Sequence, residues 1–129
     1  MKRAHQSLRH ALHGLHHAVA AERNLRLFLG TYTVVLILAE IENIPMIQWL
    51  LLIVSGALFL AIELINTALE RLVDTCDELW RKIDTKANGH HMGLKLTKDV
   101  ASAASLISLC LNVVVILSIF LPLMVQRMI

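Results

Sequence analysis

Four polar side chains recur at helical spacing at the end of a long apolar stretch, and they are of the types that handle protons and metal ions. They are Glu63, Asn66, Glu70 and Asp74. On a helix, spacings of i, i+3, i+7 and i+11 place them on one face. Oxygen ligands of this kind suit Mg²⁺, which commonly shares the phosphates of a substrate, and a carboxylate can also take a proton from a hydroxyl. The set therefore indicates metal or proton chemistry.

The stretch before these side chains, Ile44 to Ile62, is 19 residues long and contains no charged residue. That length suits a membrane span. A carboxylate held at bilayer depth costs about 2.5–3.5 kcal/mol, so such residues are usually functional. We therefore expect the polar face to lie where a span meets the membrane surface.

The composition indicates a small membrane protein that crosses the bilayer several times. Of 129 residues, 57% are hydrophobic and 17% are charged, and the mean hydropathy is +0.65. Soluble domains average about 45–50% apolar and about 25% charged residues. The net charge of +2 is too small to indicate a nucleic-acid partner. No linker is visible, so we expect a single domain over residues 1–129.

Hydrophobic periodicity predicts an all-α fold with one surface helix and three membrane spans. Residues 5–24 form a basic amphipathic pattern, which is expected to lie flat on the membrane surface. Apolar blocks predict spans at about 25–39, 44–62 and 100–125, and the helix of the second span has no breaker before Asp74. The polar stretch 75–99 is expected to be a loop.

The distribution of Lys and Arg predicts the orientation of these spans. Five lie in the N-terminal segment and six in residues 63–99, whereas the turn 40–43 has none. The positive-inside rule then places the N-terminus and the 63–99 segment in the cytoplasm. The four polar residues would face the cytoplasm, where nucleotides are available.

Phosphoryl transfer is one reaction that these groups would support, because it depends mainly on positioning and charge neutralisation. Glu22 lies at the end of the predicted surface helix, and Lys95, Lys98 and Asp99 lie just before the third span, all near the same membrane face. The sequence has neither a Walker A motif nor a kinase catalytic-loop motif. The spacing alone thus leaves this reaction as one hypothesis among several.

Three other interpretations remain open at this point. The polar face could join helices within a bundle, with its acids pairing to bases such as Arg71. The protein could be a non-enzymatic ion carrier, although a carrier needs polar residues across the membrane and span 100–125 has no charge. His10, His13 and His17 have spacings that could bind zinc, but no further ligand set accompanies them.

Three segments of the chain resemble a known family. ELINTALERLVD contains the four polar residues, SLRHALHGLHHAVAAERNLRL covers the predicted surface helix, and HMGLKLTKDVASAA precedes the third span. Together they resemble the small prokaryotic diacylglycerol kinases, which include the undecaprenol kinases. The resemblance covers nearly the whole chain.

The resemblance implies a homotrimeric membrane kinase whose active sites are shared between subunits, with ATP and Mg²⁺ bound at the cytoplasmic face. It implies that Glu63 is the catalytic base, that Glu22 and Glu70 hold the metal, and that Asn66 and Asp74 support the site. The implied ATP contacts are Arg3, His10, Glu22, Glu70, His91, Lys98 and Asp99, and the implied lipid contacts are Glu63 and Arg26.

The substrate expected from the resemblance is a membrane lipid alcohol. Diacylglycerol is the first expectation and undecaprenol is the alternative, in a bacterial cytoplasmic (inner) membrane. Two features depart from the family pattern: the stretch between Asp74 and His91 is several residues longer, and Phe28 stands where one branch commonly has His. The segment ERNLR is nonetheless similar to that branch, many of whose members prefer undecaprenol.

Overall fold

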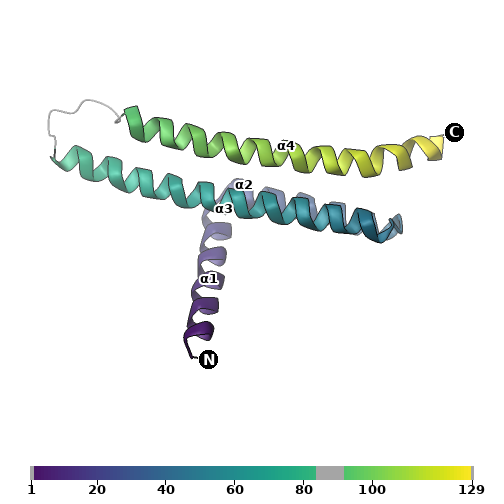
Figure 1. The fold of residues 1–129 in the computed structure, drawn as a ribbon, viewed down its shortest axis with the longest axis horizontal. Helices are drawn as coiled ribbons and strands as arrows, with labels where there is room; N and C mark the ends of the chain where they lie inside the picture. The colour runs from purple at the N-terminus through teal and green to yellow at the C-terminus, as the bar shows by residue number, and fades with distance from the viewer. Residues whose placement is uncertain (1, 84–91, 129) are drawn as a thin grey trace. The chain divides into compact units, whose positions relative to one another are not determined.

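The computed structural model describes residues 2–83 and 92–128, and nearly all of them are helical (Figure 1). The helices are α1 (Lys2–Ala21), α2 (Arg23–Ile41), α3 (Met46–Ile83) and α4 (Met92–Met128). The all-α prediction is therefore confirmed. The chain divides into two compact units, Met1–Glu42 and Asn43–Ile129.

Three of the helices are long and apolar enough to cross a membrane, namely α2, α3 and α4. This confirms the prediction of three apolar helices of span length. The predicted span 25–39 lies within α2, the span 44–62 covers the first half of α3, and the span 100–125 lies within α4.

The prediction of a loop over residues 75–99 is wrong at both ends. Helix α3 continues to Ile83 and α4 already starts at Met92, so residues 75–83 and 92–99 are helical. The polar residues here stabilise helix: Arg81 forms an ion pair with Asp77 one turn earlier at 3.1 Å. Polar composition alone therefore does not end a helix. Residues 84–91, which include His91, lie outside the described residues.

In the first unit, α1 and α2 are separated by a single residue, Glu22. Its backbone is extended, with φ −95° and ψ 115°, and this breaks the helix. The Arg26 guanidinium then donates hydrogen bonds to the carbonyls of Val19 (3.1 Å) and Ala20 (2.6 Å). These carbonyls end α1 and lack partners within it, so Arg26 caps the helix. Helix α1 corresponds to the predicted surface helix 5–24, and it ends at Ala21, three residues before the predicted end.

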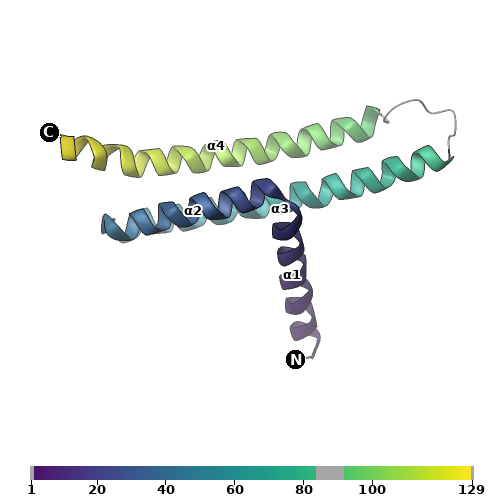
Figure 2. The same ribbon diagram turned by 180° about the vertical axis from the view of Figure 1, so that it is seen from behind.

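In the second unit, α3 and α4 run antiparallel and side by side, as both views show (Figures 1 and 2). The chain reaches α3 through a turn in which Asn43 has a φ of 49°. Asn tolerates this left-handed conformation better than most residues. Pro45 precedes α3, and its carbonyl oxygen accepts a hydrogen bond from the backbone N–H of Gln48 at 2.9 Å.

The α3–α4 pair buries polar side chains beside apolar ones such as Leu52, Phe59 and Ile119, and it exposes many further apolar side chains. Polar side chains that are buried include Ser55, Glu63, Asn66, Thr67, Asp77, Ser105, Ser108 and Asn112. In contrast, Ile107 is 70% exposed and Val114 is 61% exposed. This distribution suits helices that present apolar surface to lipid or to other helices and hydrogen-bond to each other through their polar groups.

Candidate functional site

The four polar residues that the sequence places on one helix face all lie in α3. Glu63 and Asn66 are both 8% exposed, Glu70 is half-buried and Asp74 is exposed. The environment thus changes along the helix from a buried carboxylate at Glu63 to a hydrated one at Asp74. A buried carboxylate that keeps a hydrogen-bond donor suits proton chemistry, and exposed ones suit contact with a water-soluble co-substrate.

Each carboxylate of this face has a donor from α4 opposite it. The Ser105 hydroxyl donates to Glu63 Oε2, and the Ser102 hydroxyl donates to Glu70 Oε1 at 3.5 Å. The Lys98 ammonium group donates to Asp74 Oδ1 at 2.9 Å. The sequence predicted a role for Lys98 but none for the two serines. Which residues of α4 lie opposite the carboxylates depends on the register of the two helices, which spacing along one helix does not give.

Asn66 forms a hydrogen bond with Glu70 within the polar face, and its own side-chain oxygen has no partner among the described residues. Its side-chain amide donates to Glu70 Oε1 at 3.2 Å. Its own carbonyl oxygen, Oδ1, is buried and has no hydrogen-bond partner within the described part of the chain. Buried polar atoms are nearly always bonded, so an unpaired one is expected to have a ligand or partner in the working protein.

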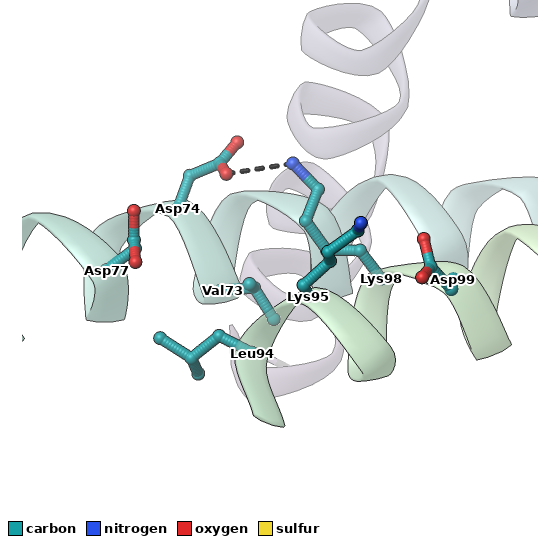
Figure 3. Close-up of a pocket in the computed structure, with 7 residues that line it drawn as sticks. All are labelled: Val73, Asp74, Asp77, Leu94, Lys95, Lys98 and Asp99. Atoms are coloured by element: carbon teal, nitrogen blue, oxygen red, sulfur yellow. Dashed lines mark hydrogen bonds and ion pairs between the residues drawn. The ribbon is translucent and has the colours of Figure 1, made fainter. Parts of the chain in front are cut away.

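A pocket of about 280 Å³ lies between α3 and α4 at the polar end of this face (Figure 3). It is lined by Val73, Asp74, Asp77, Leu94, Lys95, Lys98 and Asp99. Figure 3 shows the ammonium group of Lys98 directed at Asp74, with Lys95 beside it. Complete ligand sites usually measure about 300–1,000 Å³. At about 280 Å³, this pocket is slightly smaller than a complete ligand site.

Lys98 lies before the charge-free residues 100–125, at the hydrated end of the pair. The hydrogen bond that it donates to Asp74 raises the pKa of its ammonium group above the usual value, and the charges of Asp74, Glu70 and Asp77 act in the same direction. Lys98 is thus fully charged at neutral pH. It supplies one positive charge beside three carboxylates.

The remaining sequence-predicted residues lie on separate elements. Arg3 and His10 are exposed on α1, and Arg26 caps α1. Asp99 is exposed on α4 and lines the pocket with Asp74 and Lys98. Glu22 belongs to the first unit and Glu70 to the second, so their predicted joint role as metal ligands stays a prediction. Among residues 2–83 and 92–128 of this one chain, no three His, Cys, Asp or Glu side chains form a metal-binding group.

A further polar pair joins the same two helices in the apolar part of the bundle. The Asn112 amide donates to the Ser55 hydroxyl at 3.1 Å, and both residues are buried. The sequence prediction did not mention either residue. A lone Asn in an apolar span is a usable signal, because its amide needs a partner in a bilayer.

Comparison with known proteins identifies the family. The model of the family described as prokaryotic diacylglycerol kinase matches residues 9–120. A diacylglycerol kinase of Synechocystis sp. is 30% identical over 123 residues, which cover 95% of this chain and 65% of that protein. An undecaprenol kinase of Bacillus subtilis is 28% identical over 123 residues, which cover 95% of this chain and 91% of that protein. These matches confirm the sequence-based recognition, and the chain belongs to the prokaryotic diacylglycerol kinase family of lipid kinases.

Proposed function

We propose that this protein transfers the γ-phosphoryl group of ATP to the hydroxyl of a membrane lipid, with diacylglycerol as substrate and phosphatidic acid as product. The observation that supports this best is the graded set of carboxylates on α3. Glu63 is buried between α3 and α4, whereas Asp74 and the pocket beside it are open to water. A lipid hydroxyl would reach the first, and a nucleotide would reach the second.

In the proposed reaction, Glu63 accepts the proton of the lipid hydroxyl as that oxygen bonds to the γ-phosphorus. The bond from the γ-phosphorus to the bridging oxygen breaks, and ADP leaves with that oxygen. Lys98 and Asp99 at the pocket would hold the nucleotide, together with Arg3, His10 and His91. Phosphoryl transfer of this type needs in-line positioning and charge stabilisation more than covalent chemistry by the protein.

Mg²⁺ fits the donor set that α3 presents. The carboxylate of Glu70 and the unpaired Oδ1 of Asn66 are hard oxygen donors one helical turn apart, the type that Mg²⁺ prefers. Glu70 would hold the ion with Glu22, and Asn66 and Asp74 would support them. When bound, the ion supplies positive charge to the phosphate oxygens during transfer.

The assembly that we propose is a homotrimer in the bacterial inner membrane, with α1 lying on the cytoplasmic surface. On α1 the residues Leu8, Leu12 and Leu15 recur at helical spacing, and Arg9 and several histidines fill the other faces. A helix of this composition binds an anionic membrane surface. This placement leaves the polar end of the α3–α4 pair in the cytoplasm, as the distribution of Lys and Arg predicts.

The test is an assay of phosphate transfer from labelled ATP to diacylglycerol in detergent micelles, with and without Mg²⁺. The wild type should label the lipid only with Mg²⁺, and Glu63→Gln should abolish labelling because an amide cannot accept the proton. Glu78→Gln is the matched control, since Glu78 is an exposed acid of the same helix. Wild-type rates in Glu63→Gln would contradict the role of Glu63.

Undecaprenol is the alternative substrate, and one observation favours it. The Bacillus subtilis relative, whose length this chain nearly covers, is an undecaprenol kinase. Offering both lipids in one assay decides between them. A higher kcat/KM for undecaprenol would replace diacylglycerol in the proposal and leave the mechanism as stated.

A further inference from the structure

Ser105 uses its hydroxyl differently from the other buried serines of the α3–α4 pair. Ser55 donates to the Leu52 carbonyl at 3.0 Å, and Ser108 donates to the Ser105 carbonyl at 2.8 Å. Both bonds stay within one helix, which is the ordinary arrangement for serine in a membrane helix. The Ser105 hydroxyl instead crosses to α3 and donates to Glu63 Oε2.

The contact is made in a buried environment. Ser105 and Glu63 are both 8% exposed. A hydrogen bond to a carboxylate is worth more than one between neutral groups, and a low dielectric strengthens it further. The bond therefore restricts the rotation of the Glu63 carboxylate more than an exposed contact would.

The bond also distinguishes the two oxygens of the carboxylate. A serine hydroxyl has one proton to donate, and here it goes to Oε2. Oε1 is then the oxygen that is left to accept a proton from a substrate hydroxyl. Fixing one oxygen sets the direction in which the other one points, and small errors in such a direction slow a proton transfer substantially.

We propose that Ser105 is a positioning residue of the kinase reaction, which orients the Glu63 carboxylate by holding Oε2 so that Oε1 faces the lipid hydroxyl. This inference rests on the proposed function of Glu63 as the base. Ser105 acts through Glu63 and does not itself bind ATP or lipid. Its loss should therefore lower kcat and leave the KM values for ATP and lipid unchanged.

The decisive comparison is between Ser105→Thr and Ser105→Val. Thr and Val have nearly the same shape, and both are β-branched, so they disturb the helix packing alike. They differ in the hydroxyl group. Ser105→Thr should keep kcat within about twofold of wild type, and Ser105→Val should lower it about tenfold, since a hydrogen bond to a charged group is lost.

Ser108→Ala and Ser105→Ala form a second matched pair. Both positions are buried in α4, but the Ser108 hydroxyl bonds to a backbone carbonyl and does not contact a carboxylate. Ser105→Ala should match the loss in Ser105→Val, and Ser108→Ala should retain the wild-type kcat. Circular dichroism and size-exclusion chromatography of each variant in detergent check that fold and assembly are intact.

The outcomes separate the inference from the proposed function. An inactive wild type, tested on both lipids, would refute the proposed function and the inference with it. An active wild type with equal kcat in the Thr and Val variants would refute the positioning role alone. A change confined to KM, or an equal loss in Ser108→Ala, would refute it too, because either result indicates binding or general packing.

Discussion

At the scale of single residues, the α3 face is a series of carboxylates whose surroundings differ although their side chains are alike. Glu63 is buried against a serine hydroxyl, Glu70 accepts from both Asn66 and Ser102, and Asp74 is paired with a lysine in water. Burial and donor type decide what a carboxylate does. This difference supports the proposed roles of Glu63 in proton transfer and of the Asp74 end in nucleotide contact.

Lys98→Met should weaken ATP binding with little effect on stability. The Lys98–Asp74 pair is exposed, with 36% and 63% of the two side chains accessible, and such pairs contribute at most about 1 kcal/mol. The lysine would still be needed for phosphate, so we expect the KM for ATP to rise about tenfold. The measurements are ATP kinetics and the thermal unfolding midpoint in detergent.

Lys82→Met is the control for this variant, because Lys82 is an exposed lysine near the end of α3 that does not line the pocket. It should leave the KM for ATP unchanged. A large drop in the unfolding midpoint of Lys98→Met, with an unaltered KM, would show that Lys98 has a structural role only.

The positions of the α3 carboxylates could be predicted from the sequence, but their partners could not. Spacing along one helix gives a face directly, and it located Glu63, Asn66, Glu70 and Asp74. Which residue of α4 lies opposite each of them depends on the register of two helices separated by the stretch 84–91. That register follows from the packing of both helices together, and hydropathy does not reveal it.

At the scale of elements, the existence and type of the helices followed from the sequence, whereas several ends did not. Apolar blocks predicted all three spans. The prediction of a loop over 75–99 was wrong because an exposed polar helix and a loop have similar compositions. The Asp77–Arg81 ion pair does not reveal the helix in advance, because the two side chains meet only when the helix has formed. The helix break at Glu22 could not be predicted, because no Pro or Gly lies next to it.

The Arg26 cap should be needed for the end of α1. Arg26→Gln removes the guanidinium that bonds to the Val19 and Ala20 carbonyls, so the last turn of α1 should fray. The loss of a cap costs about 1 kcal/mol. Hydrogen exchange of the amides of residues 18–22 should become faster in this variant.

Arg23→Gln is the control, because it removes a neighbouring exposed arginine and leaves the cap in place. Its amide exchange should match the wild type. Unchanged exchange in Arg26→Gln would mean that the cap does not hold α1, and a lower affinity for lipid in that variant would favour the predicted substrate contact.

At the scale of the whole molecule, one chain does not present a complete set of metal ligands within its described residues. The exposed apolar side chains of α3 and α4 leave ample surface for lipid and for further helices. The proposed homotrimer would pack its protomers through part of this surface. A site shared between protomers would take Glu22 from one protomer and Glu63 and Glu70 from its neighbour.

Mixing two inactive variants tests this arrangement. Glu22→Gln and Glu63→Gln protomers, co-assembled in equal amounts, should recover about a quarter of wild-type activity. Each site then receives an intact Glu22 from one protomer in half of the cases, and an intact Glu63 from the neighbouring protomer in half of those. A mixture of Glu63→Gln and Glu63→Ala protomers should stay inactive. Failure of the first mixture to recover, with mixed assembly verified by tagged pull-down, would place Glu22 and Glu63 of each site on one protomer.

The pairing of Ser55 with Asn112 and of Ser105 with Glu63 has a consequence for biogenesis. A helix that inserts alone would carry an amide or a carboxylate without its partner, and an unpaired polar group is costly in hydrocarbon. Inserted as a hairpin, α3 and α4 satisfy each other's polar groups before they meet lipid. We therefore expect α3 to insert into the bilayer less efficiently in a chain truncated before α4. Synthesis of α4 is expected to complete the insertion of α3.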